Sequence, residues 1–100
     1  MEESIIIINM PKTSTQPAIT ITGEFISANH NSKNHSYHFT IIDVVPNIEI
    51  PNSSEAGNSS ISVVINNSEP IPATFWKITE NDGTYILKTY SNNIDKSKDK

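Results

Sequence analysis

Residues 75–90 read Phe-Trp-Lys-Ile-Thr-Glu-Asn-Asp-Gly-Thr-Tyr-Ile-Leu-Lys-Thr-Tyr and carry the clearest structural signal in this chain. Two runs rich in β-branched and aromatic residues, 75–79 and 85–90, flank a polar turn at 80–83 that ends in Asp-Gly. Strand-forming residues on both sides of an Asp-Gly pair indicate a β-hairpin. Since side chains alternate along a strand, each strand is predicted to have one buried and one exposed face.

The register of this hairpin depends on the length of its loop. A two-residue loop would place Lys77 directly opposite Lys88, where like charges destabilise the pair. A three-residue loop that begins at Asn81 would instead pair Lys77 with Leu87 and Trp76 with Lys88, whose aliphatic stem would then cover the indole. On the basis of charge we predict the three-residue loop.

Four further strand-like runs precede the hairpin, at residues 4–9, 18–28, 36–45 and 61–66. Ile48 and Ile50 alternate within the turn-rich crossing at 46–60 and mark a candidate short edge strand. Ile, Val and Thr together make up 30 of the 100 residues, whereas Ala, Leu, Met, Gln, Glu, Lys and Arg make up only 22. Because β-branched side chains suit a pleated sheet, this composition favours an all-β protein.

Six to seven short strands in 100 residues predict a small antiparallel β-sandwich, Ig-like or jelly-roll-like, with a small β-barrel or a partial trefoil-like fold as the alternative. We expect one β domain at 1–92 and a flexible charged tail at 93–100. The run Ile5–Ile8 is apolar on both faces and is expected at a sheet edge, where a second copy could pair. Gly23 interrupts an apolar face and predicts a bulge or a close backbone approach.

Charge and composition exclude several partners. The net charge is −4 and there is no Arg, so the chain is a poor candidate for binding nucleic acid. There is no Cys for a disulfide or a thiol site. The chain opens with two acids and only four consecutive apolar residues, unlike a signal peptide, and no apolar run could span a bilayer. We therefore expect a cytoplasmic protein that does not bind membranes.

No pattern in the sequence indicates catalysis. No serine lies in a Gly-x-Ser-x-Gly turn, the three glycines are isolated, and the acids are scattered singly. We therefore expect no enzyme activity and no cofactor. His30, His35 and His38 are weak candidates for a metal site because they lie within nine residues. In an extended strand His35 and His38 would point to opposite faces, so we interpret the three histidines as polar loop residues.

The hairpin aromatics are the best candidates for a binding surface. Phe75 and Trp76 are adjacent and must face opposite ways, so one of them is expected to be exposed. The predicted binding residues are Trp76, Tyr85, Tyr90, Lys88, Asn81 and Asp82. The expected function is a non-catalytic protein-binding module, peptidase-inhibitor-like or an assembly subunit, whose partner is another protein or a second copy in a homodimer. The alternative is a small lectin in which Trp76 or a tyrosine stacks on a sugar.

Residues 76–88 resemble a hairpin of the mycocypins, a family of cytosolic mushroom inhibitors of cysteine peptidases, and of related fungal β-trefoil lectins. The shared pattern is Trp-x-Ile/Val-Thr, a polar turn that ends in Asp-Gly, and then alternating Tyr-x-Ile/Leu. The resemblance implies a cytosolic, β-rich binding or inhibitory protein. The inhibitory loops of the family lie near the N-terminus, where this chain has no matching residues.

Overall fold

The computed structural model describes residues 4–30, 34–53 and 60–90 and shows an all-β protein, as predicted. The strands are β1 (Ile5–Met10), β2 (Ile19–His30), β3 (Asn34–Val45), β4 (Ile61–Ile65), β5 (Ile71–Ala73), β6 (Phe75–Asn81) and β7 (Thr84–Tyr90). Within these ranges there is no helix, and so none that could cross a membrane. The predicted tail at 93–100 lies outside the described residues.

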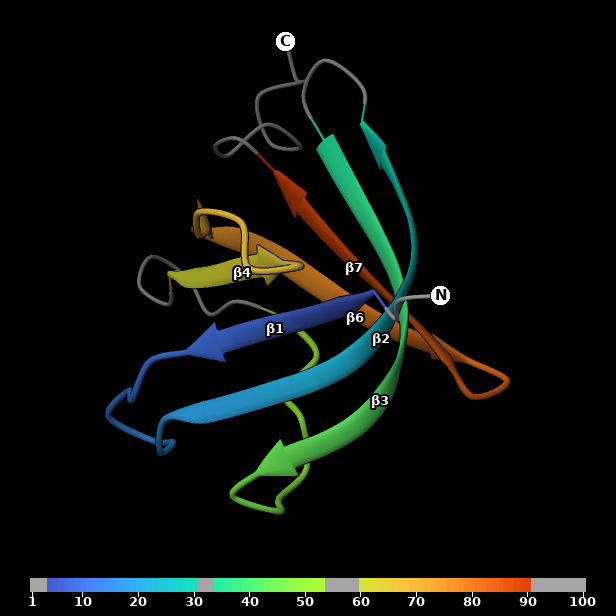
Figure 1. Cartoon of the computed structure of the whole chain (residues 1–100). Coiled ribbons are helices and arrows are strands. Elements are labelled where there is room, and N and C mark those ends of the chain that lie inside the picture. The colour runs from blue at the N-terminus through green and yellow to red at the C-terminus, as the bar shows by residue number, and fades with distance from the viewer. Residues whose placement is uncertain (1–3, 31–33, 54–59, 91–100) are drawn as a thin grey trace, which may run out of the picture.

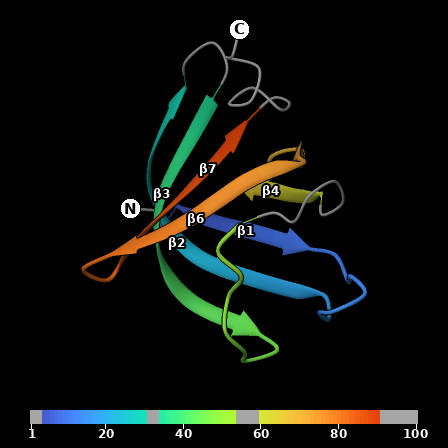
Figure 2. The same cartoon turned by 180° about the vertical axis from the view of Figure 1, so that it is seen from behind.

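All seven strands form one antiparallel sheet in the order β5-β4-β1-β2-β3-β7-β6. β5 and β6 lie at opposite edges of this sheet, yet only Thr74 separates them in the chain. The sheet must therefore curl until its two edges approach each other, and Figures 1 and 2 show the resulting half-barrel. A sandwich of two separate sheets is not confirmed, because the described strands hydrogen-bond in a single sheet.

The core fills the concave face of the curled sheet. In β1, alternate residues point inward, and the partner strands on both sides place their own apolar residues opposite them; Ile8, for example, lies between Ile21 and Val63. The buried apolar residues are Ile6, Ile8, Met10, Ile19, Ile21, Tyr37, Phe39, Ile61, Val63, Trp76, Ile78 and Leu87. The sheet therefore covers its own apolar face, without a helix or a second sheet among the described residues.

The strong bend of β2 and β3 in Figure 1 coincides with two irregularities in their pairing. The first shift, at Gly23, leaves Ile42 as an extra residue in β3, and the second, after Phe25, leaves Ile26 as an extra residue in β2. Such bulges bend a strand and increase its twist. A Cβ atom on Gly23 would collide with the carbonyl oxygen of Thr40. The predicted bulge and close approach at Gly23 are both confirmed.

The predicted three-residue hairpin loop is wrong. The loop has two residues, Asp82 and Gly83, and both have positive φ values, 59° and 85°, which is the type I′ turn that matches strand twist. Lys77 therefore lies opposite Lys88. This register sets the buried Ile78 opposite Leu87, which is 0 % exposed, whereas the predicted one would have set Lys77 there. The free energy gained by burying Ile78 against Leu87 outweighs the repulsion between the exposed Lys77 and Lys88.

The edges of the sheet also differ from the prediction. β1 is not an edge strand, because β2 and β4 pair with it on either side. No strand forms at Ile48 and Ile50; instead the Ile78 N–H donates to the Asn52 carbonyl oxygen at 2.8 Å, so residues just beyond the predicted strand cover the edge of β6. The other edge, β5, has three residues including Pro72, which lacks an N–H to donate. The β6 edge is thus covered at Lys77 and Ile78, and the β5 edge is short and contains a proline, two features that disfavour edge-to-edge pairing.

Substitution of Gly23 by Ala is expected to destabilise the protein by roughly 1–3 kcal/mol, because the added methyl group forces the Thr40 carbonyl away. The measurement is the free energy of unfolding in urea. Gly83→Asn is the comparison variant, because its site is open, so any loss of stability there comes from the φ of 85° and not from a clash. Equal stability of Gly23→Ala and the native protein would contradict the assigned close approach.

Replacement of Lys77 by Glu is expected to raise the free energy of unfolding by roughly 0.2–1 kcal/mol, because it converts a like-charge cross-strand pair into an opposite-charge pair with Lys88. Lys12→Glu changes the net charge equally in the exposed β1–β2 loop and serves as the control. If Lys77→Glu is no more stable than Lys12→Glu, the two-residue register is not supported.

Candidate functional site at the open end of the half-barrel

The segment 46–53 runs from the end of β3 toward β6 (Figure 2), and its residue Ile50 packs against the core on the concave face. It is held by the hydrogen bond from the Ile78 N–H to the Asn52 carbonyl oxygen and by a β-bridge between Ser53 and Lys77. The segment is thus anchored at one end and creates a hollow on each of its two sides.

The larger hollow is a groove of about 410 Å³ between this segment and the β6–β7 hairpin. Ile50, Pro51 and Ile78 are half-buried or buried and form its apolar floor, whereas the acidic residues Glu49 and Glu80 are exposed and lie at its rim. The remaining lining residues are Asn52, Thr79 and Tyr85. None of these lining residues is basic, so the groove combines apolar surface with negative charge.

Two contacts hold the hairpin side of the groove in place. The Tyr85 ring stacks on Phe39, with centroids 5.9 Å apart and planes 22° apart. Glu80 lies directly opposite Tyr85 in the β6–β7 ladder, and its Oε2 accepts a hydrogen bond from the Gly83 N–H at 3.0 Å. Because both side chains have fixed partners within the fold, a ligand would meet them already positioned.

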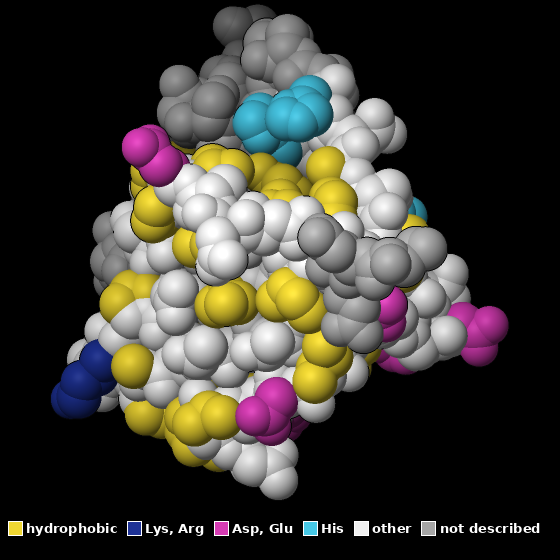
Figure 3. All heavy atoms as spheres, viewed as in Figure 1, with side chains coloured by type: hydrophobic (Ala, Val, Ile, Leu, Met, Phe, Trp, Pro, Cys, Tyr) yellow, Lys and Arg dark blue, Asp and Glu magenta, His cyan; other side chains and the backbone are white. Residues whose placement is uncertain are grey.

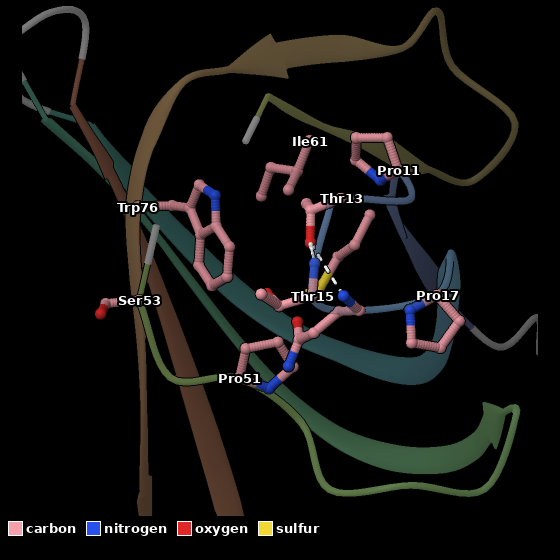
Figure 4. Close-up of a pocket in the computed structure, with 10 residues that line it drawn as sticks. Pro11, Thr13, Thr15, Pro17, Pro51, Ser53, Ile61 and Trp76 are labelled. Atoms are coloured by element: carbon pink, nitrogen blue, oxygen red, sulfur yellow. Dashed lines mark hydrogen bonds between the residues drawn. The ribbon is translucent and has the colours of Figure 1, made fainter. Parts of the chain in front are cut away.

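The smaller hollow lies on the other side of the 46–53 segment and measures about 50 Å³. Figure 4 shows Trp76 and Ile61 facing the β1–β2 loop across it. That loop is organised by Thr13, whose Oγ1 accepts hydrogen bonds from the N–H groups of Thr15 and Gln16 at 3.3 and 3.0 Å. The pocket can therefore admit only a small group, between Trp76 and a structured loop.

The predicted hairpin residues do not form one surface. Trp76 is buried, with 4 % of its surface exposed, so it is not the exposed member of the pair Phe75 and Trp76, and it lines the smaller pocket instead. Tyr85 faces inward and lines the groove, whereas Tyr90 and Lys88 lie on the outer face opposite Phe75 and Lys77. The remaining two predicted residues, Asn81 and Asp82, are exposed at the turn. Of the predicted set, only Tyr85 lines the groove.

The histidines separate into a pair and a single residue. His30 and His35 lie directly opposite each other in the β2–β3 ladder, with ring centroids 4.3 Å apart. His38 lies on the opposite face of β3 from His35, as their spacing predicted. Within the described ranges no three or more His, Asp or Glu residues come together as a metal site. The spacing of five positions from His30 to His35 is short enough for a hairpin that sets them opposite each other. Both residues were instead predicted to lie in a loop.

Tyr37 lies beneath this pair. Burial raises the pKa of Tyr37 above its ordinary value of 10.0, and a hydrogen bond with the Thr89 side chain acts in the opposite direction. Its hydroxyl is 3.3 Å from Nδ1 of His35. Tyr37 therefore remains neutral at physiological pH and links the core to the histidine pair.

The raised pKa of Tyr37 makes stability depend on alkaline pH. Folding favours the neutral phenol of Tyr37. The contribution of Tyr37 to the free energy of unfolding is therefore complete below pH 10 and is lost as the pH rises through the folded-state pKa. Tyr37→Phe is expected to lose roughly 1 kcal/mol of stability near pH 7, because the hydrogen bond is missing. Between pH 9 and 11, however, its Tm is expected to fall less than the Tm of the native protein. Parallel Tm curves for the two proteins over this range would contradict the assignment.

Comparisons of the chain with family models, with curated proteins and with solved structures gave no match. The likeness of residues 76–88 to the mycocypin hairpin is therefore not extended by a wider similarity. The groove, the pocket and the histidine pair are the features of the described residues that could bind a ligand.

Proposed function

We propose that this protein is a non-catalytic protein-binding module that holds an extended segment of its partner in the groove between residues 49–52 and the β6–β7 hairpin. The observation that carries the proposal is the combination of an apolar floor with the carboxylates of Glu49 and Glu80. This combination suits a peptide segment in which an apolar side chain lies next to a Lys or Arg.

The size of the groove supports a ligand larger than a single small group. Its volume of about 410 Å³ falls within the range of roughly 300–1,000 Å³ typical of ligand sites, whereas the pocket beside Trp76 measures about 50 Å³. A third hollow of about 420 Å³, beside Met10 and Ile19, has no charged lining residue. The groove therefore offers both volume and charged groups that fix a ligand's orientation.

Charge supports a basic partner. The chain carries a net charge of −4, and the groove is lined by two carboxylates and no basic residue. Complementary charge mainly accelerates association and suppresses wrong partners, while apolar contacts supply most of the affinity. A peptidase-inhibitor-like or assembly role would use this same surface, with the β1–β2 loop organised by Thr13 as a second contact.

A carbohydrate is the second candidate ligand, and Tyr85 is the observation that favours it. Tyr85 lies in the groove with the Asn52 amide and the carboxylates of Glu49 and Glu80. An aromatic ring with amide and carboxylate groups can stack on a sugar and bind its hydroxyls. Both candidates therefore predict binding at the same residues, and the ligand class distinguishes them.

Selection from a random peptide library displayed on phage tests the proposal. Peptides with Lys or Arg beside an apolar residue are expected to be enriched on the native protein. Glu49→Lys is expected to weaken their binding at least tenfold, because it reverses a charge at the rim of the groove. Glu69→Lys is the matched control, an exposed acid in the β4–β5 connection.

Two outcomes would contradict the protein-binding proposal. Equal binding by the Glu49→Lys and Glu69→Lys variants would place the peptide elsewhere. A positive glycan array that Glu49→Lys abolishes, together with no enriched peptide, would favour the lectin. Light scattering of the native protein tests whether a second copy of the chain is the partner.

A further inference from the structure

The tip of the β2–β3 hairpin carries two histidines in direct contact. His30 is the last residue of β2 and His35 the second residue of β3, and they oppose each other in the ladder. Their ring centroids are 4.3 Å apart and their planes are tilted by 56°. Figure 3 shows histidine side chains gathered on the surface near the upper end of the molecule. Both imidazoles are thus presented together at an accessible position.

The separation of the rings is compatible with one shared metal ion. A metal–nitrogen bond of about 2.0–2.1 Å plus roughly 1.1 Å from nitrogen to ring centroid puts each centroid about 3.2 Å from the metal. Two centroids 4.3 Å apart then subtend an angle of about 85° at the ion. Tetrahedral coordination would need a separation of about 5.2 Å by the same arithmetic. With one nitrogen of each ring turned toward a common point, the pair suits neighbouring positions of a square-planar or octahedral ion.

A hydrogen-bonded chain behind the pair orients one of the ligands. Nδ1 of His35 lies 3.3 Å from the Tyr37 hydroxyl, which is buried and hydrogen-bonds the Thr89 side chain. When Nδ1–H donates to the Tyr37 oxygen, the lone pair of Nε2 is free for a metal. Metal-binding histidines usually have such a partner on the second ring nitrogen, which fixes the tautomer and the ring orientation.

We propose that His30 and His35 form a binding site for a divalent transition metal, with Cu²⁺ preferred and Ni²⁺ next. Imidazole suits both ions, Cu²⁺ heads the general affinity order, and both accept ligands at about 90°. Water completes the coordination, because the described residues supply two ligands. The site is independent of the proposed function, since the groove lies between residues 49–52 and the other hairpin.

Titration of the full-length protein with Cu²⁺ alone tests the proposal. We expect one equivalent to bind, with an electron paramagnetic resonance spectrum that shows nitrogen ligands. His30→Asn and His35→Asn are each expected to weaken Cu²⁺ binding at least tenfold, and His38→Asn, on the opposite face, to leave it unchanged. Tyr37→Phe is expected to weaken it by about 10–100-fold while keeping both ligands. Calorimetry is expected to show tighter binding of Ni²⁺ than of Zn²⁺.

Retention of Cu²⁺ binding by the His30→Asn/His35→Asn double variant would overturn the proposal, as would the absence of a one-equivalent step in the native protein. Circular dichroism melting of each variant confirms that it folds. Amide resonances of the native protein give a second measurement, because bound Cu²⁺ should broaden those near His30 and His35 first. Broadening centred at His38 would likewise contradict the site.

Discussion

The structure depends on the close approach of Gly23 to the Thr40 carbonyl oxygen, where β2 and β3 bend. The buried apolar residues of the described ranges lie on one face of one sheet, and no described residue forms a helix or second sheet to cover them. That face leaves water only if the sheet curls over itself. A side chain at position 23 would hold the two strands apart at the bend, so a glycine there makes the curl attainable.

The sequence was sufficient to predict an all-β protein and most of its strands, because alternation of apolar residues is a local signal, but it did not predict a single curled sheet. It was not sufficient for the hairpin register. The prediction weighed the repulsion between Lys77 and Lys88, worth at most about 1 kcal/mol, but not the face on which Leu87 lies. Moving one large apolar side chain from core to solvent costs roughly 1.5–3 kcal/mol, so the buried face decides the register. A shift of one residue reverses every side chain of a strand.

The dependence of the buried face on strand register also explains which site residues could be predicted. The reasoning that Phe75 and Trp76 face opposite ways was correct, but which of them is buried follows from the register, and Trp76 is the buried one. The groove depends on the contact of Asn52 with Ile78, two residues far apart in the chain with no local pattern that links them. Tyr85 was predicted because it belongs to the hairpin itself.

The curl also explains two exposed apolar residues that would otherwise suggest a docking surface. Ile26 and Ile42 are 55 % and 56 % exposed, and each is the extra residue of one of the two register shifts between β2 and β3. A bulge adds a residue without a partner, and in these bulges that residue is turned outward while its neighbours Phe25 and Ile41 pack against the core. Their exposure follows from the bend that buries the concave face. The surfaces with convergent chemical groups are instead the acidic groove and the histidine pair, where side chains from separate strands or segments meet.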